Sequence, residues 1–215
     1  MLVRYFMTSP VTTLTADMPC RDALNLFREE GFRRAPVVLE GRLVGMISDR
    51  DLLRVLPYSA AEASTEPGLR AEHTLVGAVM TRNPVTTTPE SHLEDVAAVM
   101  LQRKIGGVPV LDRGAVVGIL TETDLFRALV AIGGYPGSAR MTVSLPSAKK
   151  EPEDVALIAL RLGLRMVTRL THASRGGAPL VTLRVVGEHW ADLPEALAAA
   201  GYGVIEIVPP TAKAA

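Results

Sequence analysis

An internal repeat is the feature that most constrains how this chain can fold. Ala-Pro-Val-Val at residues 35–38 returns as Val-Pro-Val-Leu at residues 108–111, and Asp51 returns as Asp124, each displaced by 73 residues. A second copy in the same order indicates two units of one architecture. A unit of about sixty residues buries its own hydrophobic face poorly, so we expect the two copies to pack against each other.

Each copy has the pattern of a mixed unit of strands and helices. Pro-Val-Thr-Thr at residues 10–13 and 84–87 predicts a short extended piece, and an amphipathic helix follows, which Gly31 ends in the first copy. Two short apolar runs then flank turns at residues 40–42 and 112–114, which indicates a hairpin. With a second helix after the hairpin, the expected order is strand, helix, strand, strand, helix.

The last third of the chain has a different periodicity. Its elements follow the order βαββαβ, which is that of the ferredoxin-like split unit. The fold class is therefore α/β, of the α+β type, with two packed repeats and a ferredoxin-like domain. The predicted C-terminal elements are a strand at 141–145, a helix from Pro152 to Leu164, strands at 167–171 and 180–186, a helix at 193–200 and a strand at 204–208.

Composition breaks mark the borders between these parts. Residues 59–72 are rich in Ser, Thr, Glu, Pro and Gly, and residues 133–137 contain three glycines and a proline. The boundaries that we expect are 1–60 for the first repeat, 61–74 for a linker, 75–132 for the second repeat, 133–139 for a second linker, 140–210 for the C-terminal domain and 211–215 for a disordered tail.

Composition and charge disfavour several classes of protein. Lys plus Arg and Asp plus Glu both number 23, and aromatic residues make up only 4%, which argues against a nucleic-acid partner. Cys20 is the one cysteine, so neither an intramolecular disulfide nor a four-thiolate zinc site can form. The N-terminus lacks the pattern of a signal peptide, and no apolar run is long enough to span a bilayer. We therefore expect a cytoplasmic protein with no membrane partner.

The sequence carries no signature of a catalytic site. It contains neither the phosphate-binding Gly-x-x-x-x-Gly-Lys loop, the dinucleotide fingerprint, the His-Glu-x-x-His motif nor the Gly-x-Ser-x-Gly elbow. His92 stands near Glu94 and Asp95, but acids are favoured at the start of a helix without any metal. We expect a protein that is not an enzyme, with no metal and no required cofactor.

A hydroxyl followed by an acid opens the second helix of each copy. Ser48 precedes Asp51, and Thr121 precedes Asp124, in the spacing of a capping box. The same arrangement suits a ribose phosphate, because the start of a helix offers free N–H groups and a carboxylate can accept ribose hydroxyls. The local role does not exclude the binding role, and both interpretations stay open.

Two adjacent cations precede the strand of the first copy. Arg33 and Arg34 can grip a phosphate, although an ordinary solvated pair would have the same sequence. The second copy has Gly106 and Gly107 at this place, with no charge. If phosphates bind, the two halves should bind them unequally.

The ordered motifs resemble those of a tandem pair of cystathionine-β-synthase (CBS) domains, a Bateman module, over residues 1–132. The resemblance implies clefts between the repeats that bind adenosine-containing ligands, with AMP, ADP, ATP and S-adenosylmethionine as candidates. It also implies ribose contacts from Asp51 and Asp124. The other implied contacts are hydroxyls of Ser48, Thr121 and Thr123, adenine contacts at Val11, Thr12, Val85, Thr86, Met46 and Ile119, and phosphate contacts at Arg33 and Arg34.

The C-terminal βαββαβ order is similar to that of an ACT domain. Its first strand-to-helix turn, residues 146–152, has no glycine, which favours a pairing role over an amino-acid site. The whole order resembles that of bacterial acetoin-utilisation regulatory proteins of the AcuB type. It implies a homodimeric, ligand-sensing regulatory protein, with a partner enzyme that reads the change. The alternative is an interaction module that docks on a partner enzyme without binding a nucleotide.

Overall fold

The computed structural model describes residues 1–56, 73–145, 152–174, 176–177 and 179–210 of the chain. Most of the predicted linker 61–74, most of the glycine-free turn 146–152 and the tail 211–215 lie outside the described residues. The described chain divides into two compact units, Met1–Ala128 and Leu129–Ala215.

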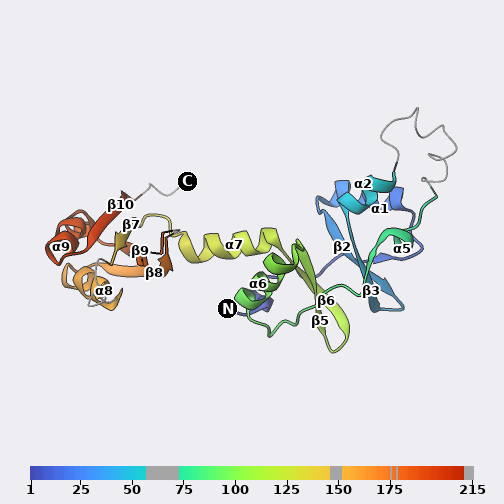
Figure 1. The fold of residues 1–215 in the computed structure, drawn as a ribbon, viewed down its shortest axis with the longest axis horizontal. Coiled ribbons are helices and arrows are strands. Elements are labelled where there is room, and N and C mark those ends of the chain that lie inside the picture. The colour runs from blue at the N-terminus through green and yellow to red at the C-terminus, as the bar shows by residue number, and fades with distance from the viewer. Residues whose placement is uncertain (57–72, 146–151, 175, 178, 211–215) are drawn as a thin grey trace. The chain divides into compact units, whose positions relative to one another are not determined.

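The first unit contains both repeats and one mixed sheet (Figure 1). The sheet order is β1-β2-β3-β6-β5, with β4 paired to β3. The elements of this unit are η1 (Val3–Tyr5), β1 (Leu14–Thr15), α1 (Cys20–Glu30), β2 (Arg34–Leu39), β3 (Arg42–Ser48), α2 (Asp49–Val55), α5 (Val76–Val79), β4 (Thr81–Arg82), α6 (Leu93–Arg103), β5 (Gly107–Asp112), β6 (Ala115–Thr121) and α7 (Glu122–Gly133), which continues into the second unit.

The predicted hairpins form in both repeats. The turn between β2 and β3 has Glu40 and Gly41 at φ of 50° and 75°, and that between β5 and β6 has Arg113 and Gly114 at 49° and 86°. Two successive residues with positive φ match the twist of a tight antiparallel hairpin. Gly31 ends α1 in the left-handed conformation, as predicted.

The extended pieces only partly become strands. In the first repeat the strand begins at Leu14, just after the Pro-Val-Thr-Thr segment, and pairs with β2 in parallel. Among the described residues of the second repeat, the equivalent segment makes a single bridge, from Thr87 to Val110. Proline has no N–H to give to a ladder, so Pro10 and Pro84 leave their segments outside regular pairing.

The first few residues of each repeat pack into the core of the other repeat, which the sequence did not predict. Val3 is fully buried in the core of the second repeat, and Val76 is fully buried in the core of the first. Thr8 and Ile119 exchange backbone hydrogen bonds of 2.9 and 3.0 Å. Gly118 permits this approach, because a Cβ there would lie 2.8 Å from the Thr8 carbonyl oxygen.

The second unit is a four-stranded antiparallel sheet in the order β10-β7-β9-β8, and the βαββαβ prediction is confirmed in its element order (Figure 1). Met141 and Leu183 are fully buried on one face of the sheet, together with Val155 and Leu197 from its two longer helices. The elements are β7 (Ala139–Ser144), α8 (Pro152–Arg161), β8 (Arg165–Ala173), β9 (Pro179–Val186), η2 (Glu188–Asp192), α9 (Leu193–Ala199) and β10 (Gly203–Val208).

Candidate nucleotide site

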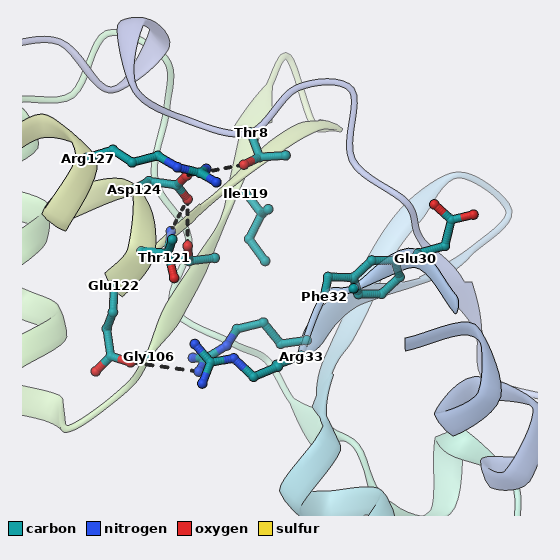
Figure 2. A pocket seen from close by; sticks show the side chains of 13 residues that line it. Thr8, Glu30, Phe32, Arg33, Gly106, Ile119, Thr121, Glu122, Asp124 and Arg127 are labelled. Atoms are coloured by element: carbon teal, nitrogen blue, oxygen red, sulfur yellow. Dashed lines mark hydrogen bonds and ion pairs between the residues drawn. The ribbon is translucent and has the colours of Figure 1, made fainter. Parts of the chain in front are cut away.

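A cavity of about 400 Å³ lies in the first unit and has walls from both repeats (Figure 2). Its volume falls within the range of small-molecule sites, about 300–1,000 Å³. The end of α1 and the start of β2 form one wall, and the end of β6 and the start of α7 form the other. The lining residues are Thr8, Glu30, Gly31, Phe32, Arg33, Arg34, Gly106, Ile119, Thr121, Glu122, Thr123, Asp124 and Arg127.

Asp124 is the most buried acid of this cavity, with 2% of its side chain exposed. Its Oδ2 accepts hydrogen bonds from the backbone N–H of Thr121, at 2.8 Å, and from the Thr121 hydroxyl, at 2.6 Å. Its Oδ1 accepts from the Thr8 hydroxyl, at 3.3 Å, and from Nη1 of Arg127, at 3.1 Å. Figure 2 shows Thr8, Thr121 and Arg127 converging on Asp124. The half of the predicted capping box in which the acid accepts from the backbone N–H of Thr121 is therefore present.

Asp51 makes the same local contacts in a more open place. It accepts from the backbone N–H of Ser48, at 3.0 Å, and from the Ser48 hydroxyl, at 2.6 Å, in a complete capping box. Its side chain is 26% exposed, and Nη1 of Arg54 is 3.9 Å from its Oδ1. Asp51 does not line the cavity around Asp124.

Arg34 crosses from the first repeat to the second. Its Nη2 lies 3.9 Å from Oε2 of Glu122, and its side chain is 22% exposed. Burial lowers the pKa of Arg34, and the nearby Glu122 carboxylate opposes that shift. A Cβ on Gly106 would collide with the Arg34 guanidinium, and one on Gly107 would lie 2.6 Å from Arg34 Cδ. The two glycines of the second copy thus leave the space that Arg34 occupies.

The structure brings together one part of the predicted residue set. Ile119, Thr121, Thr123, Asp124, Arg33 and Arg34 line the cavity. Val85 and Thr86 line a separate pocket of about 300 Å³ beside α6. Val11, Thr12, Met46, Ser48 and Asp51 do not line the cavity around Asp124.

Sequence reasoning missed other residues of this wall. Thr8 reaches Asp124 across 116 positions of the chain, through the exchanged N-terminal segment, and no local signal marks it. Arg127 could have been found, because Arg54 stands at the same place in the first copy, three residues after its acid. Glu122, which also lines the cavity and lies near Arg34, was not among the predicted site residues.

The described parts of the chain contain neither a group of residues suited to a metal ion nor a membrane-spanning helix. Within residues 1–56, 73–145 and the described stretches beyond them, no three His, Cys, Asp or Glu side chains are grouped so that they could hold a metal ion. None of the helices in that part of the chain is both long and apolar enough to cross a membrane.

Comparison with known families agrees with the repeat. The CBS domain model matches residues 3–58 and 76–131, which together make up about half of the chain. The chain belongs to the CBS domain family. Among curated relatives, this CBS protein is 33% identical over 125 residues to the uncharacterized protein MJ1225 of Methanocaldococcus jannaschii, a match that covers 57% of this chain and 45% of that one.

Solved CBS structures resemble the paired repeats. CBSX2 of Arabidopsis thaliana, solved in complex with AMP, is 30% identical, with a TM-score of 0.52 over 61% of this chain and 97% of that one. The CBS domain pair of MJ0100, solved with 5-methylthioadenosine and S-adenosylmethionine, is 28% identical, with a TM-score of 0.50 over 61% and 97%. An AcuB protein of Vibrio cholerae, described as a putative acetoin utilization protein, is 28% identical, with a TM-score of 0.52 over 61% and 91%.

Proposed function

We propose that this CBS protein is a non-enzymatic sensor that binds an adenosine nucleotide of the AMP, ADP or ATP class beside Asp124. The observation that carries the proposal is the opposition of Asp124 and the Arg33–Arg34 pair across one cavity, from different repeats. The complexes of CBSX2 with AMP and of MJ0100 with S-adenosylmethionine support the adenosine part of the proposal.

The walls of the cavity match the chemistry of a nucleotide. A carboxylate that opens a helix can accept ribose hydroxyls, and Thr123 adds a hydroxyl at the same helix start. Arg33 and Arg34 supply positive charge for a phosphate, and Ile119 supplies an apolar surface for a base. Because the sulfonium of S-adenosylmethionine is itself a cation, this wall favours an anionic nucleotide over that ligand.

The proposal treats the two predicted clefts as unequal. The second repeat has the uncharged Gly106 and Gly107 at the place of Arg33 and Arg34, and the cavity beside Asp124 is lined by both arginines. We therefore propose that the Asp124 cleft is the phosphate-binding one, and that the Asp51 cleft binds a nucleotide more weakly or leaves it unbound.

We propose that nucleotide binding rearranges either a homodimer or the C-terminal unit, and that this rearrangement transmits the signal. Its βαββαβ order, with sheet order β10-β7-β9-β8, supports an ACT-like domain with a pairing role. We further propose a place in acetoin utilisation, in the cytoplasm and with a partner enzyme, and the likeness to the AcuB protein of Vibrio cholerae supports the acetoin part.

The second candidate function is a docking module that binds no nucleotide. The observation that favours it is an apolar stripe on α7, where Phe126, Leu129 and Val130 are 66%, 61% and 69% exposed at helical spacing. The same stripe also suits a second copy of the chain, so the nucleotide experiment has to decide between the two functions.

The test is calorimetric titration of the full chain with AMP, ADP, ATP and S-adenosylmethionine, with thermal denaturation beside it. A ligand present at 100 times its dissociation constant stabilises the native state by about 2.7 kcal/mol. We expect binding of a phosphate-bearing ligand that Asp124→Asn abolishes and that the matched Asp51→Asn leaves largely intact. Asparagine keeps the shape of the side chain and can still accept from Thr121. If no adenosine ligand binds the folded wild type, the docking module replaces the sensor.

A further inference from the structure

The acceptor positions of Asp124 are already filled in the structure. A carboxylate offers about four lone-pair positions. Thr121 fills two of them through its N–H and hydroxyl, and Thr8 and Arg127 fill the other two. A ribose that donates hydrogen bonds to this carboxylate must therefore displace at least one of these donors.

Arg127 is the donor that can leave most easily. Both Thr121 contacts belong to the cap of α7 and are fixed by the fold, and Thr8 is held by two backbone hydrogen bonds to Ile119. The Arg127 side chain is 72% exposed, so its guanidinium can leave Asp124 for water without any movement of the backbone. The contact also lies on Oδ1, the oxygen that is not committed to the cap.

We propose that Arg127 acts as a competitive latch on the nucleotide site, so that ribose binding at Asp124 requires the release of its guanidinium. This inference rests on the proposed function. It adds a residue that sets the affinity for the nucleotide and that changes its contacts when the nucleotide is bound. Arg127 lies on α7, the helix that runs from the cavity at Glu122 to Gly133 and on toward β7. Ligand binding thus changes a side-chain contact on the segment that joins the two units.

The first copy offers a natural comparison. Arg54 follows Asp51 by three residues, as Arg127 follows Asp124. Its Nη1 is 3.9 Å from Oδ1 of Asp51, which is beyond hydrogen-bond distance, and its side chain is 78% exposed. The latch is therefore closed only beside the acid that lines the described cavity, and Arg54→Met is a matched control for Arg127→Met.

The probe is adenosine, which has the ribose and base but no phosphate that a freed arginine could contact. We expect Arg127→Met to bind adenosine roughly two- to fivefold more tightly than the wild type, because the largely exposed guanidinium that competes for Oδ1 of Asp124 is gone. Arg54→Met should bind adenosine as the wild type does. Circular dichroism and thermal denaturation of each variant establish that it is folded.

The outcomes separate the latch from the sensor. If AMP binds and Asp124→Asn abolishes that binding, but Arg127→Met holds adenosine no more tightly than the wild type or shows no detectable binding, the sensor stands and the latch is wrong. If AMP fails to bind the wild type, or Asp124→Asn leaves AMP binding unchanged, the sensor at Asp124 fails and the latch falls with it. Tighter adenosine binding in Arg54→Met by the same factor would also overturn the latch, since the effect would then be one of general charge.

Discussion

Replacing Gly106 by alanine tests whether Arg34 forms the phosphate wall. The added Cβ would collide with the Arg34 guanidinium, which must then leave its place over Gly106 and beside Glu122. The φ of Gly106 lies outside the left-handed region, so alanine fits the backbone there. We therefore expect the fold to keep its stability to within about 1 kcal/mol.

The expected magnitude follows from the contact that would be lost. A hydrogen bond to a charged group contributes about 1.5–3 kcal/mol, and partial exposure reduces it to about 1–2 kcal/mol here. Since about 1.4 kcal/mol is a tenfold change in affinity, AMP should bind Gly106→Ala roughly 5- to 30-fold more weakly. Adenosine should bind as tightly as it does to the wild type, because it has no phosphate for Arg34 to hold.

The assay is calorimetric titration with AMP and adenosine, on a double-mutant cycle of Gly106→Ala and Arg34→Met. If both substitutions act by taking the same Arg34 guanidinium away from the phosphate, the double variant should bind AMP no more weakly than Arg34→Met alone does. Gly133→Ala is the control, because a Cβ at that glycine would meet open space. The role of Arg34 is refuted if Gly106→Ala binds AMP with the affinity of the wild type, or if its affinities for adenosine and AMP fall by the same factor.

Two further predictions concern the helix stripe and the buried thiol. Leu129→Arg places a charge in the exposed apolar stripe of α7. Analytical ultracentrifugation should therefore show a dimer for the wild type and a shift toward monomer for the variant. A monomeric wild type would contradict the predicted homodimer. Cys20 is fully buried, and burial raises the pKa of its thiol, so the native protein should react with a thiol reagent at least about tenfold more slowly than the unfolded protein. The thiol of the unfolded chain loses its proton at a lower pH than the buried thiol does. The free energy of unfolding should therefore fall as pH rises above 9.0, the ordinary pKa of a thiol. The same pH series on Cys20→Ala shows how much of the fall comes from this thiol.

Features that depend on neighbouring residues could be predicted from the sequence. The hairpins, the left-handed Gly31 and the contacts of Ser48 and Thr121 with their acids all follow from residues a few positions apart. The βαββαβ order of the second unit was readable for the same reason, because alternating and helical hydrophobic patterns are local. These signals placed Asp51 and Asp124 correctly at helix starts, and Arg33–Arg34 against Gly106–Gly107 already marked the two halves as unequal.

The surroundings of each acid, however, are visible only in the folded chain. Thr8 reaches Asp124 across 116 positions, and Arg34 reaches Glu122 through space that Gly106 and Gly107 leave empty. Each of these contacts joins segments that are distant in the chain, so no periodicity or local spacing encodes it. The equal motifs of the two copies thus acquire unequal surroundings, because a side chain's environment is set by the elements packed against it and not by its own neighbours in sequence.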